Sequence, residues 1–245
     1  MKKIFALFCI IMMCSCSTTD SSQTELTNET AEQLYRQGYN YLQKTSYESA
    51  AKNFEKIELE HPYSKWAVKS KLMGAYAYYK AEKYDDAIMA LNRFIKFHPS
   101  NKDVAYAYYL KGLCYYDQIA PAQKDQSNTR QAQDTFAQLI ILFSDTEYAK
   151  DAAKKINLIV DHLAGQEMNI GRYYLKNQNY LSALNRFNVV VDNYQTTPQI
   201  EEALYRQVEI YTIMGLKNQA MKSAKVLEHN YPKSKWNAQA QKLIK

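Results

Sequence analysis

The residue types that most often carry out catalysis or hold metal ions form no recognisable set in this sequence. Its four histidines are His61, His98, His162 and His229. None has the spacing of a metal-binding pair such as HExxH, and no phosphate-binding, nucleophile-elbow or CxxC motif occurs. Adjacent carboxylates at 85–86 and 201–202 stand at the starts of expected helices, where they complement the helix dipole. We therefore predict no enzyme, no cofactor and no metal site.

A cysteine near the N-terminus offers a different chemistry, the attachment of lipid to a thiol. A short basic start precedes an apolar run over residues 4–13, which has the pattern of a secretory signal. The run is shorter than the roughly 20 residues of a membrane span. It ends in MMCSCS, where Ser15 supplies the small residue that signal processing requires before Cys16. This site resembles the lipobox of bacterial lipoproteins, and Cys14 is the alternative position.

The signal peptide is thus predicted over residues 1–15, and the mature chain begins at the lipidated Cys16. Ser17 follows that cysteine where Asp would be a retention signal, and in Gram-negative lipoproteins this implies sorting to the outer membrane. Several acyl chains hold a protein on a membrane permanently, because each buried CH₂ contributes about 0.8 kcal/mol. Residues 16–30 are rich in Ser and Thr and lack aromatic side chains, so we expect a flexible tether.

The remaining cysteine and the net charge exclude two further classes of protein. Cys114 has no partner once Cys16 is acylated, so we predict a small buried side chain and no disulfide. The net charge of +6 is spread along the chain and forms no basic cluster, so nucleic acid is not an expected partner.

From residue 31 the chain repeats a pattern of two helices. A tetratricopeptide (TPR) repeat packs two antiparallel helices, called A and B here, within about 34 residues. A small residue at position 8 lets the helices approach, and Ala occupies position 20 at their crossing. Five units fit, with Gly38, Ala75, Gly112, Gly171 and Val208 at position 8 and Ala50, Ala87, Ala132, Ala183 and Ala220 at position 20. The predicted fold class is all-α, an α-solenoid of five TPR hairpins with a C-terminal capping helix over 234–245.

The spacing of the five units is uneven and locates two insertions. Successive position-20 alanines are 37, 45, 51 and 37 residues apart. The polar stretch around Pro121 predicts a loop between the helices of the third unit. The longest interval predicts one continuous helix from 148 to about 176. We therefore divide the body into units 1–3, over 31–147, and a second half over 148–245 that holds the long helix, units 4–5 and the capping helix.

Binding chemistry is concentrated on the A helices of the first three units. Positions 2, 5, 9 and 12 of helix A face the concave groove of a TPR stack, whereas 4, 7, 8 and 11 pack inside. The predicted groove residues are Tyr35, Tyr39, Lys69, Tyr76, Tyr79, Lys80, Tyr106, Tyr109 and Tyr116. Tyr presents a large apolar ring with a hydroxyl that tolerates water, and Lys can meet a carboxylate. The pattern predicts a groove for an extended peptide rich in aromatic residues, and packing between units is the alternative for each tyrosine.

Four stretches carry a resemblance to a known family. They are HPYSKWA (61–67), AYAYYK (75–80), RFIKFHPSNKDVAYAYYLKGLCYYDQI (93–119) and RYYLKNQNYLSALNRF (172–187). They resemble the BamD (ComL) lipoproteins of the outer-membrane β-barrel assembly (Bam) machinery, and the resemblance runs from about residue 30 to the end. It implies a subunit that faces the periplasm and binds the POTRA domains of a BamA-like barrel protein through its C-terminal repeats, alongside other Bam lipoproteins. It also implies that the N-terminal repeats bind the C-terminal signals of unfolded outer-membrane proteins, which end in an aromatic residue.

The resemblance also identifies one basic residue of interest and two positions where this sequence departs from the family's pattern. Arg186 lies in the matching NRF segment and is a candidate BamA contact, with an ordinary helix surface charge as the alternative. Ser144 and Gln195 stand where family members often have Pro at the ends of units three and four, so we expect fraying there. The alternative function is a periplasmic TPR adaptor for another envelope machine, such as cell-wall synthesis or division.

Overall fold

A computed structural model describes residues 29–245 of the chain. The predicted signal peptide, Cys16 and almost all of the predicted tether therefore lie outside the described residues. Within 29–245 the chain forms eleven α-helices and no strand. The helices are α1 (Ala31–Gln43), α2 (Tyr47–Glu60), α3 (Ala67–Lys80), α4 (Tyr84–Phe97), α5 (Val104–Tyr116), α6 (Ser127–Leu142), α7 (Glu147–Lys176), α8 (Tyr180–Asn193), α9 (Ile200–Ile213), α10 (Lys217–Asn230) and α11 (Lys235–Leu243).

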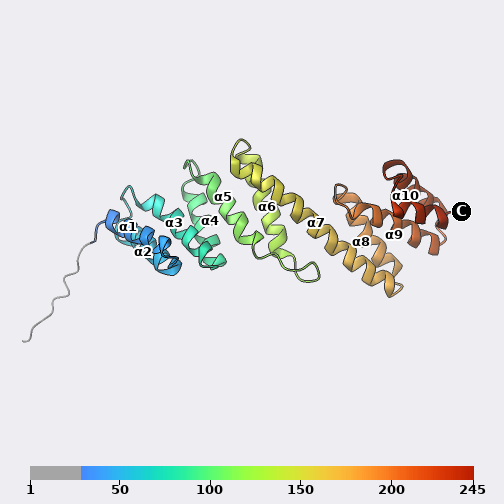
Figure 1. The fold of residues 1–245 in the computed structure, drawn as a ribbon, viewed down its shortest axis with the longest axis horizontal. Helices are drawn as coiled ribbons and strands as arrows, with labels where there is room; N and C mark the ends of the chain where they lie inside the picture. The colour runs from blue at the N-terminus through green and yellow to red at the C-terminus, as the bar shows by residue number, and fades with distance from the viewer. Residues whose placement is uncertain (1–28) are drawn as a thin grey trace, which may run out of the picture.

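The helices pair in sequence order and stack along one axis (Figure 1). Antiparallel pairs form from α1 and α2, α3 and α4, α5 and α6, the second half of α7 and α8, and α9 and α10. Each B helix also packs on the next A helix, and α11 packs on α9 and α10 as the predicted cap. The A helices α1, α3, α5 and α7 contact one another in series. The predicted solenoid of five hairpins with a capping helix is confirmed.

Glycine at position 8 allows the closest approach between paired helices. A Cβ atom added to Gly38 would lie 2.8 Å from the ring of Phe54, and one added to Gly171 would lie 2.6 Å from the ring of Phe187. Gly112 faces Phe136 in the same way. All five position-20 alanines are at most 1% exposed. Each of the three glycines therefore leaves space for a phenylalanine ring that fills the seam between the paired helices.

The long helix joins two parts of the stack. α7 runs without interruption over 30 residues, and Thr146 caps its N-terminus by accepting a hydrogen bond from the Ala149 N–H. Its first half buries Ala152, Ile159 and Leu163 against α5 and α6, and its second half buries Met168 against α8. The predicted helix from 148 to about 176 is thus correct to within one residue.

The two B-helix ends that lack proline are each followed by a hydrogen-bonded turn. The N–H of Thr146 donates to the Phe143 carbonyl and that of Thr197 to the Tyr194 carbonyl, each at 3.1 Å. The same two threonine hydroxyls also donate to these carbonyls at 2.8 Å. The expected fraying at Ser144 and Gln195 is therefore wrong, because a threonine two residues later supplies the bonds that end the helix.

The A-to-B turns hold a left-handed residue at one fixed place. Thr45, Glu82, Gln178 and Gly215 have φ of 56°, 58°, 59° and 74°. In each turn the N–H of the next residue donates to the carbonyl of the position-11 tyrosine, at 2.8–2.9 Å. This is the bond of a Schellman helix end, in which glycine usually occupies the left-handed position. The third unit replaces this turn with the predicted loop, which runs from residue 117 to 126.

Candidate functional site

The A helices bring most of the predicted groove residues together in one cluster. We call Tyr76, Tyr79, Tyr106, Tyr109 and Tyr116, together with Tyr148, the tyrosine cluster; these residues come from α3, α5 and the start of α7. The ring of Tyr148 lies 5.4 Å from the rings of both Tyr106 and Tyr109. Aromatic rings at such distances attract one another beyond the area that they bury. The cluster is a half-buried aromatic surface that crosses three helices.

Two aspartates hold hydroxyl groups of the cluster in place. Tyr109 donates to Asp151 at 2.5 Å, and Tyr79 donates to Asp117 at 2.7 Å. Burial and then these hydrogen bonds raise the pKa of both phenols above the ordinary value, so both stay neutral. The hydrogen bond from Tyr109 lowers the pKa of Asp151 below its ordinary value. These side chains are therefore fixed and cannot reorient freely toward a ligand.

One lysine lies against the cluster and pairs with one of its two aspartates. Lys155 Nζ lies 4.9 Å from the centre of the Tyr116 ring and 3.6 Å from the Asp151 carboxylate. A lysine over an aromatic ring is stabilised by the negative face of that ring. Sequence reasoning missed both Lys155 and Tyr148, because the repeat alignment resumed only at Gly171. The available signal was the buried stripe of Ala149, Ala152 and Ile159, whose spacing marks the start of α7 as an A-type helix face.

Tyr35 does not belong to the accessible surface. It is 8% exposed, and its ring lies 4.7 Å from Trp66 and 5.5 Å from Phe54. Trp66 precedes α3 and covers Tyr35 from the next hairpin, with Lys69 Nζ 5.1 Å from the Tyr35 ring. The predicted groove role of Tyr35 is therefore corrected to core packing between the first two units.

The other predicted groove residues at the N-terminal end are exposed but separate. Tyr39 is 47% exposed, and Lys69 is also exposed. Lys80 lies 5.7 Å from the Tyr47 ring on α2, toward the A-to-B turn. Within residues 29–245, no aromatic or polar interaction joins these three residues to the tyrosine cluster. They extend the surface of the A helices toward the N-terminus without closing a pocket.

Arg186 is held by a neighbouring helix and remains partly exposed. Its guanidinium lies 3.1 Å from the Glu167 carboxylate of α7, and 42% of its side chain is exposed. Tyr174, Ser182 and Asn185 line a shallow depression beside it. The arginine side of this ion pair is open to solvent, whereas the Glu167 side chain is only 15% exposed. Arg186 can therefore meet a second carboxylate from outside.

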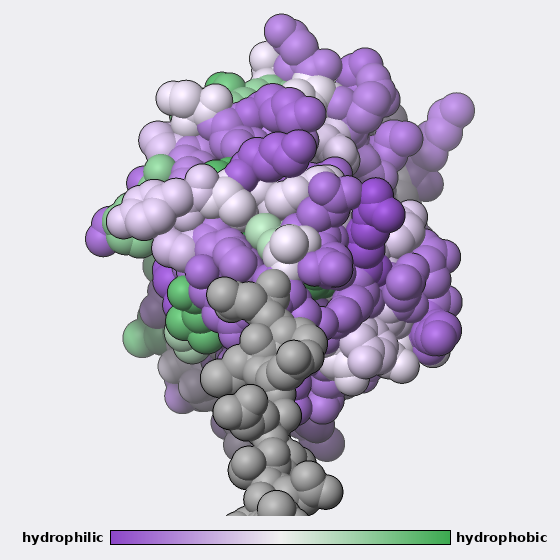
Figure 2. Space-filling model, turned by 90° about the vertical axis from the view of Figure 1, so that its left-hand side faces the viewer, coloured by the Kyte–Doolittle hydropathy of each residue, from purple (hydrophilic) through white to green (hydrophobic). Residues whose placement is uncertain are grey.

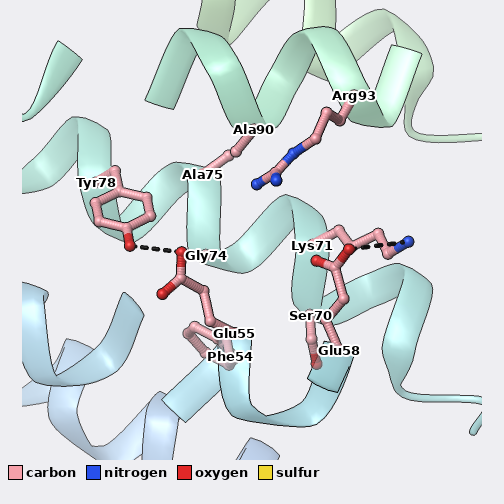
Figure 3. Close-up of a pocket in the computed structure, with 10 residues that line it drawn as sticks. All are labelled: Phe54, Glu55, Glu58, Ser70, Lys71, Gly74, Ala75, Tyr78, Ala90 and Arg93. Carbon is pink, nitrogen blue, oxygen red and sulfur yellow. Dashed lines mark hydrogen bonds and ion pairs between the residues drawn. The ribbon is translucent and has the colours of Figure 1, made fainter. Parts of the chain in front are cut away.

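A second pocket, between α2, α3 and α4, is too small to bind a ligand (Figure 3). Tyr78 donates to Glu55 at 2.6 Å, and Lys71 pairs with Glu58 at 3.4 Å on its walls. The space is about 20 Å³, which accommodates a water molecule or two. The buried Ser70 hydroxyl that lines this pocket has no protein partner within the described chain, so water is the fitting occupant. This pocket joins the first two units and carries no reaction chemistry.

The described residues contain neither a metal cluster nor a reactive thiol. Between residues 29 and 245, no group of three or more His, Cys, Asp or Glu side chains is placed to hold a metal ion. Burial raises the pKa of the Cys114 thiol to about 12, which confirms it as a buried, unreactive side chain. No helix in this part of the chain is long and apolar enough to cross a membrane.

The hairpin packing and the aromatic surface of the A helices define a TPR-type scaffold protein. Among solved structures, a tetratricopeptide repeat protein from Parabacteroides merdae covers 87% of the chain and 73% of its own, at 13% identity and a TM-score of 0.39. The TPR2AB domain of yeast Sti1, in a pHSP90 complex, covers 87% of the chain and 84% of its own length at 12% identity and a TM-score of 0.42. The TPR assignment rests on the helix pairing itself, because these TM-scores are below 0.5.

The chain belongs to the YfiO family of outer membrane lipoproteins, whose model matches residues 27–227. Its curated relatives include the outer membrane protein assembly factor BamD of Rickettsia prowazekii, 48% identical over 86% of this chain and 84% of the relative. BamD of Caulobacter vibrioides is 41% identical over 87% and 70%, and BamD of Neisseria meningitidis is 33% identical over 96% and 93%. The resemblance found in the sequence is confirmed.

Proposed function

We propose that this chain is an outer membrane protein assembly factor, a non-enzymatic subunit of a Bam complex. The observation that carries the proposal is its 48% identity to an assembly factor over 84% of that protein. The scaffold is suited to this role, because stacked hairpins offer long surfaces to several partners at once. The alternative, an adaptor for cell-wall synthesis or division, has no such support.

The proposal assigns the first three hairpins, over residues 31–147, to substrate recognition. The tyrosine cluster presents neutral phenol rings, and Lys155 lies among them. A C-terminal tail with a terminal aromatic residue and a free carboxylate complements these two groups. Because Tyr148 and Lys155 belong to α7, the proposed recognition surface extends beyond residue 147 into the long helix.

The proposal assigns residues 148–245 to the assembly machinery, through POTRA domains of a BamA-like barrel protein. Six apolar side chains at the A-to-B end of the last two hairpins are exposed by 37–65%. They are Tyr173, Leu181, Ile213, Met214, Leu216 and Met221. Exposed apolar groups gathered at one end are typical of a surface that another protein covers. Arg186 lies on α8, the helix that carries Leu181, and supplies a charge for a partner carboxylate.

The proposal places the chain on the periplasmic side of the outer membrane, held by lipid on Cys16. Cys16→Ser is expected to release the chain into the soluble periplasmic fraction. Retention in the membrane fraction would mean that Cys14 carries the lipid or that partners alone hold the chain.

Co-purification tests the function directly. The lipidated chain, tagged at its C-terminus, is recovered from detergent-solubilised envelopes, and the bound proteins are identified by mass spectrometry. We expect a BamA-like barrel protein and other Bam lipoproteins in the recovered complex. Recovery of cell-wall or division proteins without a barrel protein would overturn the proposal.

A further inference from the structure

Five exposed apolar side chains lie where the B helices of the first three hairpins end. Leu59 is 81% exposed, Phe97 65%, Ile141 79% and Leu142 56%, and Tyr63, in the turn after α2, is 99% exposed. Four of the five occupy positions 29 and 30 of their repeats, so they recur at the same place in consecutive hairpins. The turns that follow α2, α4 and α6 lie along the upper side of the stack in Figure 1. We call these five residues the apolar edge.

The apolar edge is not required by the fold. The same two repeat positions in the last two hairpins are also exposed, and they hold Asp192 and Asn193 in α8 and His229 and Asn230 in α10. Polar residues are thus fully compatible with a B-helix end. The apolar side chains of the first three hairpins therefore need an explanation outside the packing of the stack.

The chain enters the fold at this edge. Glu29, the first described residue, pairs with Lys56 at 2.7 Å, and its carbonyl lies 2.7 Å from the His61 ring. Leu59 lies between these two residues in the sequence, at the end of α2. Only residues 17–28 separate Glu29 from the proposed lipid site at Cys16. That segment reaches at most roughly 40 Å when fully extended, so a membrane that holds the lipid lies within about that distance of Glu29, beside Leu59.

Lysines accompany the first two hairpins at this edge. Lys65, Lys96 and Lys102 are exposed, and none of them has a carboxylate within 4.0 Å among residues 29–245. Acidic residues are also present at this edge: Glu60, next to Leu59, is exposed and lies 3.9 Å from Lys56. Near the third hairpin Asp145 is exposed and Glu147 pairs with Lys150. Figure 2 shows the N-terminal end of the stack as mostly hydrophilic, with apolar side chains confined to a few places on its flank. Apolar side chains beside lysines are typical of surfaces that bind anionic lipid membranes.

We propose that the apolar edge lies on the phospholipid surface of the membrane to which Cys16 is anchored. Tyr63 and Phe97 are aromatic, and aromatic side chains favour the interface between headgroups and acyl chains. Leu59, Ile141 and Leu142 insert into the lipid beside them. The lipid then limits the distance between the scaffold and the membrane, and this edge fixes the orientation of the scaffold. The last two hairpins point away from the membrane. This inference rests on the lipid anchor of the proposed function.

A vesicle-binding experiment on the unlipidated mature chain separates the edge from the anchor. The full mature chain, residues 16–245 with Cys16→Ser, is sedimented with vesicles of phosphatidylethanolamine and phosphatidylglycerol. We expect measurable binding, which becomes roughly tenfold weaker when Leu59, Phe97, Ile141 and Leu142 are all changed to Gln. The matched control changes four exposed apolar residues of the last two hairpins, Leu181, Ile213, Leu216 and Met221, to Gln and is expected to bind as the parent. Equal binding by both variants would overturn the proposal.

A fluorescence measurement on the lipidated chain tests the same surface in its anchored form. Phe97→Cys or Asn193→Cys is labelled with an environment-sensitive dye, since native Cys114 is fully buried. We expect vesicle lipids with a quencher on the acyl chain to quench the dye at 97 and leave the dye at 193 unaffected. Shielding of position 97 by an added partner protein, with no effect of lipid, would overturn the proposal in favour of a protein docking surface. Failure of lipidation at Cys16 would leave the sedimentation result intact, so the two failures are distinguishable.

Discussion

The Tyr109 hydroxyl donates a 2.5 Å hydrogen bond to the Asp151 carboxylate and thereby joins the third hairpin to the long helix. The bond links α5 to α7 across 42 residues of sequence. It stands at the centre of the tyrosine cluster, where it fixes a ring that the proposed peptide would contact.

Tyr109→Phe is expected to lower the free energy of unfolding by about 1 kcal/mol at pH 7, because it removes one hydrogen bond to a charged group at a partly exposed site. Asp151 has a lowered pKa in the folded state, so its stabilisation is complete above the ordinary Asp pKa of about 3.9 and is lost as the pH falls through the folded value. The difference between wild type and Tyr109→Phe should therefore stay constant from pH 7 to about pH 5 and shrink below about pH 4 in urea titrations. Tyr106→Phe is the control, since the Tyr106 hydroxyl makes no hydrogen bond to another residue of 29–245. An equal loss in both variants at every pH would contradict the role of Asp151.

Changing a tightly packed glycine and a loosely packed glycine to alanine should shift the free energy of unfolding in opposite directions. Gly171→Ala places a Cβ 2.6 Å from the Phe187 ring, and we expect a loss of about 1–3 kcal/mol as the helices are forced apart. Gly165→Ala meets its nearest atom only at 4.0 Å. It should stabilise α7 by about 0.5–1 kcal/mol, because alanine loses less backbone entropy in a helix. Urea titrations measure both values, and losses of similar size at both positions would show that the close approach is not the cause.

Left-handed turn residues give a prediction of stabilisation. Thr45, Glu82 and Gln178 have φ near 60° without being glycine, so each change to Gly is expected to add up to about 1 kcal/mol of stability. Thr45 should gain most, because it is β-branched. Gly215→Ala, at φ 74°, should lose a similar amount. Destabilisation by Thr45→Gly would mean that its side chain contributes more than the strained backbone costs.

Arg186→Ala tests the proposed binding of residues 148–245 to the BamA-like protein. We expect this change to reduce recovery of the BamA-like protein by roughly tenfold, if the guanidinium meets a partner carboxylate as well as Glu167. Glu167→Gln removes the internal partner and leaves Arg186 free to bind outward. Equal effects of the two substitutions would mean that Arg186 acts only within the chain.

Much of the fold follows from short-range rules that the sequence displays. Thr30 and Gln33 form a capping box at the start of α1, and the glycine-to-phenylalanine contacts recur wherever position 8 is glycine. These features depend on residues close together in one hairpin, whose geometry the repeat fixes. The left-handed turns at Thr45, Glu82 and Gln178 escaped notice, because backbone hydrogen bonds impose a conformation that these residue types do not signal.

The candidate site was predictable only in part. The row of tyrosines on α3 and α5 follows from repeat positions, but burial of Tyr35 depends on Trp66, which comes from the turn before the next hairpin. Tyr148 and Lys155 join the cluster because α7 continues the layer of A helices, a contact that spans an irregular interval in the repeat. Long-range contacts across an insertion are what a periodic pattern cannot supply.

The most direct test of the recognition surface is the affinity for a peptide that ends in a C-terminal aromatic residue. A labelled peptide with a terminal Phe and a free carboxylate is titrated with the full mature chain, and fluorescence anisotropy reports binding. Tyr76→Ala and Tyr148→Ala should each weaken binding roughly tenfold, and amidation of the peptide's carboxylate should weaken it as well. Tyr173→Ala, on the second half of α7 and 65% exposed, should bind as the wild type. Unchanged affinity in Tyr76→Ala and Tyr148→Ala, with both chains folded, would show that the tyrosine cluster packs the hairpins together and does not bind substrate.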